Sequence, residues 1–434
     1  MSSLLALRYL SPLLSYVLLL FCALYFQTVA SGQAKIAQEF FLPEKAQTEA
    51  SNIYQEFQGS FDSGEHQRNK IFLSSPIGNL HHPLSKWSFF PGKRAGLRFD
   101  EMTSLQRYLT QEWVRLFVSE VGQLKWNAIV GLEDVLKDLS RNPDSGEFDA
   151  SRDTGQYALA LFGKPGVEDL WGWRLEGHHI SIRFLFRGWK LISTTPSFLG
   201  AAPTVPRSGP MNGMTLLGEE ERIALMLVKS LKPSQLKLAC PEKPVPSDVT
   251  LGPGHPQRPE ASGILRSQLD RSQQLLLDAL LRIHLEFLNP AIYRSEWDAA
   301  VTAGLDSISF TWWGPLVMKS RHGYRLQGPT TIVELVRVTG SPGHVHIVRR
   351  SPGEDLDSPE MLRDLQESLK SINSKLWVIE DDKRQCEKDK DFGEKFIKLS
   401  RDVHFLNDDR AKIKLEINNH TGSTIKEIKE YTSY

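Results

Sequence analysis

The chain has 434 residues, of which 40% are hydrophobic and 24% are charged, a composition typical of a folded globular protein with a proper core. Its 52 basic and 52 acidic residues cancel, so no overall electrostatic field favours nucleic acid as a partner. The three cysteines, Cys22, Cys240 and Cys386, are too few and too scattered for a disulfide framework, and no Cys-x-x-Cys spacing indicates a zinc knuckle.

The N-terminus has the pattern of a secretory signal. Arg8 precedes an apolar run over residues 9–26, and small residues follow over residues 30–34. The apolar run is also nearly long enough to span a bilayer uncut, so cleavage and membrane anchorage both stay open. We therefore expect residues 1–32 to be a signal peptide or a membrane anchor, and the protein to be exported: secreted, periplasmic or held at the membrane by its N-terminus.

Predicted helices lie on both sides of residues 201–212, a loop rich in proline and glycine. Residues 33–86 are polar and mixed, and we interpret them as a lead-in or spacer before the main domain, which begins near Trp87. Within that domain, apolar residues recur at helical spacing in several segments. These segments predict helices over residues 102–121, 124–139, 219–231 and 262–288.

Strand-like segments form two groups. The first is a hairpin with strands over residues 178–186 and 189–195, preceded by a buried run over residues 157–162. The second is a meander over residues 307–350, in which short apolar runs alternate with Gly and Pro turns. Because helix-like and strand-like segments are segregated along the chain, residues 87–352 are predicted to form an α+β domain, with a mostly antiparallel sheet packed against helices.

The composition changes after Ser351-Pro352 to lysine, glutamate and aspartate with helical spacing, which indicates a domain boundary. Apolar residues at three- and four-residue intervals form one stripe over residues 362–379, and a second helix is expected over residues 392–417. The sequence therefore predicts a small all-α helical hairpin as a separate C-terminal module over residues 358–434. The apolar stripe is a helix-pairing face.

Histidines define the candidate metal site. His344 and His346 are two residues apart, so on a strand both imidazoles leave the same face, roughly 7 Å apart at the Cα level. Alternation places His178 on the apolar face of its strand and His179 on the opposite face. Two adjacent strands would then bring His178, His344 and His346 to one divalent transition metal such as zinc. The alternative is that these histidines are hydrogen-bonded structural residues.

Two carboxylates are candidates for acid–base catalysis at the same site. Glu176 has the parity of His178. Glu334 interrupts an apolar strand, where a carboxylate must be paired, protonated or coordinating. For Glu334 the alternative is a salt bridge with Arg325 or Arg337.

Aromatic residues beside the histidines are candidates for ligand binding. Trp171 and Trp173, together with His179, fit a platform on which a sugar ring stacks. For the two tryptophans the alternative is burial in the core, which is the commoner position of a Trp beside a Gly.

Two parts of the chain resemble known families. Four motifs resemble domain-of-unknown-function family 3500, over about residues 87–350: Trp171-Gly-Trp-Arg-Leu-Glu-Gly-His-His-Ile-Ser181, Thr195-Pro-Ser-Phe-Leu-Gly-Ala-Ala-Pro203, Tyr324-Arg-Leu-Gln-Gly-Pro329 and Gly343-His-Val-His-Ile347. This resemblance implies a bacterial-type, often exported protein and brings no established activity. About residues 358–434 resemble domain-of-unknown-function family 6165 through Leu376-Trp-Val-Ile-Glu-Asp381, Lys390-Asp-Phe-Gly-Glu-Lys-Phe-Ile-Lys-Leu399, Asn407-Asp-Asp-Arg-Ala411 and Lys414-Leu-Glu-Ile-Asn418, which implies a small helical module.

Three functions stay open. The first is an exported, hydrolase-like enzyme in which a His and Glu cluster holds a metal ion that activates water. The second is a non-catalytic protein that binds a small or carbohydrate-like ligand. The third is a scaffold that docks a protein partner through its C-terminal helices. No Gly-x-Ser-x-Gly elbow, phosphate loop or dinucleotide fingerprint occurs, which excludes the enzyme classes that these motifs mark.

The predicted boundary at Ser351-Pro352 leads to a first test. Because few contacts cross a linker between modules, a protease at low concentration should cut the folded chain there first. Mass spectrometry of the earliest fragments measures the position of the cut. Early cleavage inside residues 362–379, with the boundary intact, would contradict the predicted modules.

Overall fold

A computed structural model of the chain describes residues 39–61, 65–73, 87–167, 170–253, 258–338, 343–352 and 359–421. The predicted signal or anchor over residues 1–32 lies outside the described residues, as do the start of the predicted spacer and residues 422–434 of the C-terminal module. Among the described helices, none combines the length and the apolar character that crossing a membrane requires.

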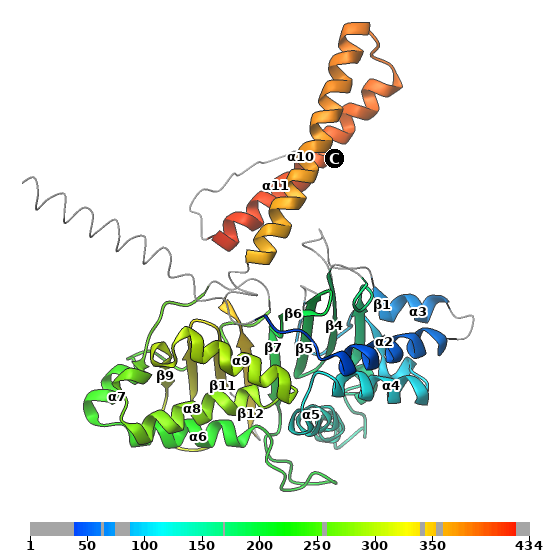
Figure 1. Cartoon of the computed structure of the whole chain (residues 1–434). Helices are drawn as coiled ribbons and strands as arrows, with labels where there is room; N and C mark the ends of the chain where they lie inside the picture. Colours follow the sequence, from blue (N-terminus) through cyan, green and yellow to red (C-terminus); the bar gives the residue numbers. More distant parts are fainter. Residues whose placement is uncertain are drawn as a thin grey trace, which may run out of the picture.

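One sheet of 12 strands organises the described part of the chain (Figure 1). The strands are β1 (Phe72–Leu73), β2 (Leu97–Arg98), β3 (Ala158–Phe162), β4 (Leu170–Gly177), β5 (Ile180–Arg187), β6 (Lys190–Ser193), β7 (Ser197–Ala201), β8 (Ile264–Leu265), β9 (Ser309–Trp313), β10 (Gly323–Gln327), β11 (Ile332–Val338) and β12 (His344–Arg350). They lie in the order β1-β3-β4-β5-β7-β12-β11-β10-β9-β8, with β2 on β3 and β6 on β5. The β1–β3 pair is parallel and the other pairs are antiparallel, so the predicted α+β fold is confirmed.

Helices precede and follow the strands in each half of the sheet. They are α2 (Glu44–Gly59), α3 (Glu65–Ile71), α4 (Ser104–Arg115), α5 (Glu120–Leu139), α6 (Gly218–Ser230), α7 (Pro233–Ala239), α8 (Arg271–Leu285), α9 (Pro290–Ala303), α10 (Pro359–Asp389) and α11 (Glu394–Thr421). The predicted helix over residues 262–288 begins later than expected. Asp270 caps α8 by accepting hydrogen bonds from the backbone of Ser272 and Gln273, and residues before it form β8 and a short 3-10 turn.

The two halves of the main domain repeat one order of elements. In the first half, β2, the 3-10 turn η1 (Phe99–Glu101), α4, α5 and the 3-10 turn η2 (Thr154–Gln156) precede β3, β4 and β5. In the second half, β8, η3 (Arg266–Gln268), α8, α9 and η4 (Leu305–Ser307) precede β9, β10 and β11 in the same way. Two similar sequences, Trp173-Arg-Leu-Glu-Gly177 and Tyr324-Arg-Leu-Gln-Gly328, also occur at equivalent places in the two halves, in β4 and at β10. We conclude that the domain is an internal duplication.

The two halves of the domain meet at the centre of the sheet. Read inward from the two sides, the strand order is β3-β4-β5-β7 and β9-β10-β11-β12, and the innermost strands β7 and β12 pair antiparallel. Their register sets Gly200 opposite His346 and Leu199 opposite Ile347. This central pair joins the two halves into one continuous sheet.

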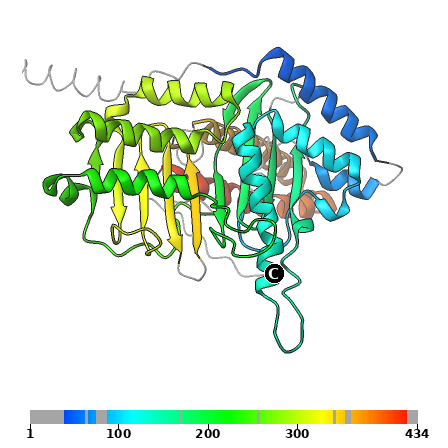
Figure 2. The same cartoon turned by 90° about the horizontal axis from the view of Figure 1, so that it is seen from below.

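The two faces of the sheet are covered differently. One face carries the main core and is covered by helices, among which α6, α8 and α9 lie on strands β9 to β12 (Figure 2). On the other face, Trp87 and Phe89 pack with Val249 and Leu251 from two loop segments. Side chains of β12 therefore alternate: Val345 and Ile347 lie in the helix-covered core, and His346 and Val348 lie on the loop-covered face.

Helix α2 is part of the domain. Its Ala50, Tyr54 and Phe57 are buried and belong to the main hydrophobic core, next to α4. The interpretation of residues 33–86 as a spacer is therefore wrong for α2. The amphipathic pattern of that segment, with apolar residues at helical spacing, was the signal for a packed helix.

The C-terminal helices α10 and α11 pack against each other as a hairpin (Figure 1), as predicted. On α10, Leu365, Leu369, Ile372, Leu376 and Ile379 follow the alternating four- and three-residue spacing of a coiled coil. These five side chains are buried or half-buried, whereas their neighbours Trp377 and Val378 are exposed. The independence of this module stays a prediction.

Close packing between the halves predicts the effect of one methyl group. A Cβ on Gly122 of α5 would lie 2.4 Å from the Phe287 carbonyl oxygen, which belongs to the rigid backbone of the second half. Gly122→Ala should lower the free energy of unfolding by about 1–3 kcal/mol, measured by urea denaturation.

Gly131 on the same helix is the matched control. A Cβ there would lie 3.3 Å from the Met211 sulfur, and this flexible side chain can move. Gly131→Ala should leave the stability unchanged or raise it by up to about 1 kcal/mol, because alanine favours a helix over glycine. Equal losses in the two variants would refute the proposed tight contact.

Candidate metal centre

A two-residue turn between β4 and β5 positions the first histidine. Gly177 pairs with Ile180, so His178 and His179 form the turn, and His179 takes a left-handed conformation with φ of 62°. Three hydrogen bonds to the backbone of the turn hold it in place. The His179 N–H donates to the Phe89 carbonyl (3.0 Å), the His179 carbonyl accepts from the Gly200 N–H (2.7 Å), and the His178 carbonyl accepts from the Tyr157 hydroxyl (2.7 Å). The strained residue is thus fixed by its surroundings.

The beginning of β12 positions the other two histidines. His344 and His346 leave the same face of this strand, as predicted, with ring centroids 4.4 Å apart. A Cβ on Gly200, the cross-strand partner of His346, would lie 2.9 Å from the His179 ring and 3.1 Å from the His346 ring. A glycine at this position of β7 therefore lets the two rings approach the sheet.

His179, His344 and His346 form one cluster, named here the His cluster. One nitrogen of each ring lies within 4.8 Å of the others, and the Nε2 atoms of His179 and His344 are 2.9 Å apart. Two nitrogens bonded to one zinc ion at about 2.05 Å lie about 2.9 Å apart at a right angle and about 3.3 Å apart at the tetrahedral angle. The His179–His344 pair therefore has the spacing that a transition-metal ion requires, and the His346 nitrogen, within 4.8 Å, would have to move closer to bind the same ion.

A carboxylate orients the third ring. The Nδ1–H of His346 donates to Oδ1 of Asp248 (2.6 Å), which leaves Nε2 with a free lone pair. This Nε2 is buried and has no hydrogen-bond partner among the described residues. A carboxylate behind a histidine, with the other ring nitrogen unpaired, is the arrangement that metal-binding histidines adopt.

Burial keeps two of the three rings, His179 and His344, neutral at neutral pH. Burial, and then the neighbouring His178 and His346, lower the pKa of His179 well below its usual value. Burial and His346 likewise lower the pKa of His344 to about 4. Neutral imidazole is the form that binds a metal ion. At neutral pH, each of these two rings therefore has a nitrogen lone pair that can bind one.

His178 lies beside the cluster and not in it. Its ring stacks on the ring of His179 with centroids 3.7 Å apart. Its Nδ1–H donates to the Glu133 carboxylate of α5, and its Nε2 accepts from the Arg152 guanidinium (3.2 Å). The structure therefore brings His179, and not the predicted His178, together with His344 and His346, while His178 stacks on the ring of His179.

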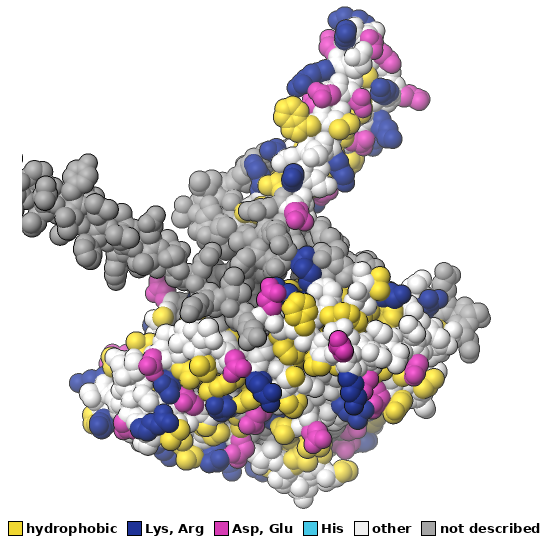
Figure 3. Space-filling view, viewed as in Figure 1, with side chains coloured by type: hydrophobic (Ala, Val, Ile, Leu, Met, Phe, Trp, Pro, Cys, Tyr) yellow, Lys and Arg dark blue, Asp and Glu magenta, His cyan; other side chains and the backbone are white. Residues whose placement is uncertain are grey.

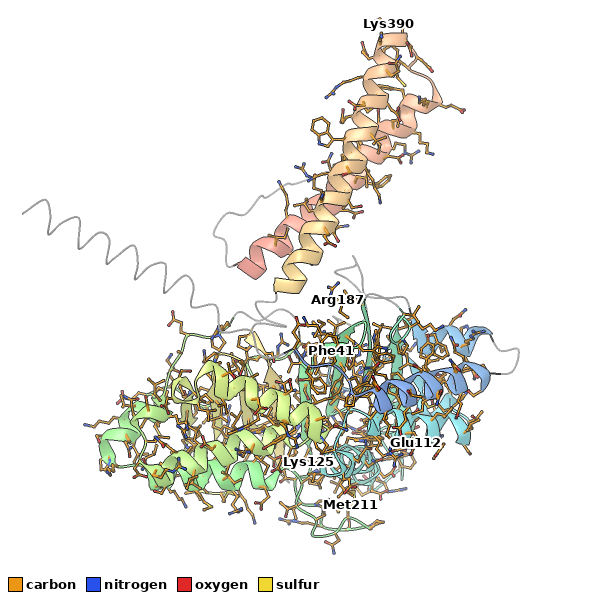
Figure 4. All side chains as sticks on the ribbon, in the orientation of Figure 1. Phe41, Glu112, Lys125, Arg187, Met211 and Lys390 are labelled. Carbon is orange, nitrogen blue, oxygen red and sulfur yellow. The ribbon has the colours of Figure 1, made fainter. Side chains whose placement is uncertain are left out.

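Three loops surround the His cluster at one end of the central strands. Arg152 comes from the loop between α5 and β3, and Asp248 comes from the loop between α7 and β8. The third loop, between β7 and α6, bonds to the start of β12 through the Thr204 N–H and the Gly343 carbonyl (3.2 Å), and Figure 4 shows its Met211 beside α5. His179 and His346 are buried while His344 is half-buried, so the cluster reaches solvent on the His344 side.

Glu176 and Glu334 do not reach the cluster and hold buried arginines. Glu176 accepts from Arg94 and Arg174, each at 2.8 Å, and burial raises the pKa of its carboxyl although both guanidinium groups oppose this. Glu334 binds Arg325 at 2.6 Å and accepts from the backbone N–H groups of Thr250 and Leu251. Their predicted catalytic role is therefore corrected to a structural one. For Glu334, the salt bridge with Arg325 was the stated alternative.

Trp171 and Trp173 lie in the core. Both are 0% exposed, and their rings stack on Phe186 and Phe184 with centroids 4.4 and 4.9 Å apart. With no exposed face, neither can stack on a ligand in this structure. The predicted sugar-stacking platform is therefore wrong, and burial beside a glycine, the stated alternative, is what the structure has.

One pattern in the sequence indicates the turn that places His179, and not His178, in the His cluster. Apolar side chains occupy odd positions before Gly177, at residues 171, 173 and 175, and even positions from residue 180 onward. A strand cannot change parity without a turn or a bulge. Asp248 had no such signal, because it lies in a proline-rich passage whose path depends on the rest of the fold.

Comparison with known proteins assigns the main domain. Residues 47–358 match the family described as "Protein of unknown function (DUF3500)". The chain belongs to this family. The DUF3500 match includes α2, both halves of the sheet and the whole His cluster, and it ends before α10. No curated protein and no solved structure matches the chain.

The structural role of Glu334 leads to a test of the correction. Glu334→Ala leaves the Arg325 guanidinium buried without its carboxylate, which should lower the free energy of unfolding by about 3–5 kcal/mol. Glu219→Ala, which removes an exposed partner of Arg222, should cost much less. Chemical denaturation measures both. A Glu334→Ala protein as stable as the wild type would refute the structural role of Glu334.

Proposed function

We propose that the protein binds one divalent transition-metal ion, with zinc as the first candidate, through His179, His344 and His346. The observation that supports this is the convergence of three imidazoles, one nitrogen from each within 4.8 Å. Asp248 would act on His346 as the outer carboxylate of a metal site. Three histidine ligands leave a fourth tetrahedral position open, which is the composition of catalytic zinc sites rather than of closed structural ones.

The hydrogen-bonding state of the ring nitrogens in the His cluster favours a bound cation over a purely structural network. Between neutral His179 and His344, one Nε2 has to carry a proton that it donates to the other, because two facing lone pairs repel. His346 has a buried Nε2 without a partner, which costs free energy unless an ion or water binds it. A metal ion satisfies all three nitrogens at once.

We propose hydrolysis as the chemistry of this site. A divalent ion with an open position supplies a Lewis acid and a water that is acidic near neutral pH. The His344 side of the cluster, between the three loops, is where a substrate would approach. His178, held by Glu133 and Arg152, would fix the His179 ring by stacking on it.

Metal content tests the proposal directly. The purified full-length chain should contain about one equivalent of zinc or a related metal per chain, measured by inductively coupled plasma mass spectrometry. His179→Ala and His346→Ala should each lose it, and Asp248→Asn should weaken binding about 10–100-fold. His404→Ala on the exposed side of α11 is the matched control and should keep the metal.

Two outcomes would count against the site. A folded protein without stoichiometric metal, even after incubation with zinc, would leave the His cluster as a structural network. Bound metal without any chelator-sensitive cleavage of p-nitrophenyl esters or phosphates would retain the metal site and remove hydrolysis from the proposal.

The hairpin of α10 and α11 favours an additional interaction function. Its exposed side chains include Trp377, Val378 and Phe405. Figure 3 shows Lys and Arg side chains mixed with Asp and Glu side chains on this module. We propose that the exposed apolar side chains dock a protein partner, which is the same hairpin of a second chain. Sedimentation velocity should then show a dimer that Trp377→Glu dissociates, and a monomeric wild-type chain at high concentration would refute pairing of two hairpins.

Export is also proposed, on the N-terminal apolar run alone. Cell fractionation should find the chain outside the cytoplasm or with the membrane. A full-length, soluble chain in the cytoplasm would overturn it.

A further inference from the structure

A cleft of about 470 Å³ lies in the first half of the domain, apart from the His cluster. Helices α4 and α5 form its walls, and the turns η1 and η2 form its floor. Its volume falls in the range of pockets that bind small molecules. None of its lining side chains belongs to the His cluster or to the residues that contact it.

Aromatic side chains line this cleft. Tyr108 of α4 is 59% exposed although it is large and partly apolar, and Phe99 lies nearby in η1. Trp126 of α5 is 0% exposed and donates its Nε1–H to Gln123 (2.7 Å), so it forms the buried wall of the cleft and presents no open face to a ligand. The exposed ring of Tyr108 is therefore the flat apolar surface at the rim of the cleft.

Planar polar groups line the remaining wall. The Gln111 Nε2–H donates to Asn127 Oδ1 (3.1 Å), which links α4 to α5, and the Asn127 Nδ2–H donates to the Gln123 carbonyl (2.8 Å). Among the residues that the structure describes, the second N–H of Asn127 and the Oε1 of Gln111 form no further hydrogen bond. On the floor, Asp153 accepts from the Gly155 N–H through Oδ1 (2.7 Å), which leaves Oδ2 for a ligand. The cleft therefore offers both donors and acceptors.

Charges at the cleft balance. Asp100 is paired with Arg98 at 2.9 Å, and the two other charged lining residues, Asp153 and Arg107, have opposite charges. A ligand with a net charge of either sign would gain little from this surface. An uncharged ligand with many hydroxyl groups would use both the donors and the acceptors, because a hydroxyl does both.

From these features we propose that the cleft binds a neutral mono- or disaccharide, with one sugar face stacked on Tyr108 and its hydroxyls bonded to Gln111, Asn127 and Asp153. A sugar presents an apolar face of C–H groups and a rim of hydroxyls, which is the combination that the cleft provides. The cleft is separate from the His cluster, so binding there needs no metal.

The test uses the full-length protein and saturation-transfer NMR with six probes: glucose, galactose, mannose, N-acetylglucosamine, cellobiose and maltose. At least one probe should receive saturation and bind with a dissociation constant in the millimolar range or below. Tyr108→Ala should weaken that binding about tenfold or more, because an aromatic stack contributes about 0.5–1.5 kcal/mol and further contacts depend on it. Asn127→Leu should weaken it as well.

Leu124→Ala provides the matched control, since Leu124 is an exposed apolar residue of α5 that does not line the cleft. It should bind the probe as the wild type does. Treatment with a chelator should also leave binding unchanged, which separates this site from the His cluster. Absence of saturation for all six sugars, or saturation that Tyr108→Ala does not reduce, would overturn the proposal.

Discussion

The antiparallel pair of β7 and β12 is the constraint on which the rest of the domain depends. It is the only place in the described sheet where the two halves share a ladder of backbone hydrogen bonds, and it sets Gly200 opposite His346. A slip of this ladder by one residue would turn His346 into the helix-covered core and Ile347 onto the loop-covered face. Register at the centre of the sheet therefore determines the core and the His cluster together.

The two halves share one order of elements, but the two ends of the central β7–β12 pair differ. Where β12 begins, two histidines face a glycine and a turn. Where β7 begins, the Thr194 hydroxyl donates to Glu296 (2.7 Å) and accepts from Arg349 (2.5 Å). At that end a hydroxyl links a carboxylate to a guanidinium group. Among the described residues, only the end with the histidines brings three metal-ligating nitrogens together.

The sequence predicted what local patterns determine. Alternation and helical spacing predicted the α+β fold, the shared face of His344 and His346, and the helical hairpin, because these depend on neighbours a few residues apart. The exchange of His178 for His179 was missed because strand parity was continued through a turn. The partners of Glu176, Glu334 and His346 come from loops far along the chain, and no local pattern records such contacts.

The ligands of the His cluster are divided between the halves. His179 lies in the first, and His344 and His346 lie in the second. Neither half alone supplies more than two of the three nitrogens, so the three-ligand site requires both halves. An ion bound there would also act as a cross-link that closes a loop of the chain between residues 179 and 344, and its removal would loosen the junction of the halves before either half unfolds.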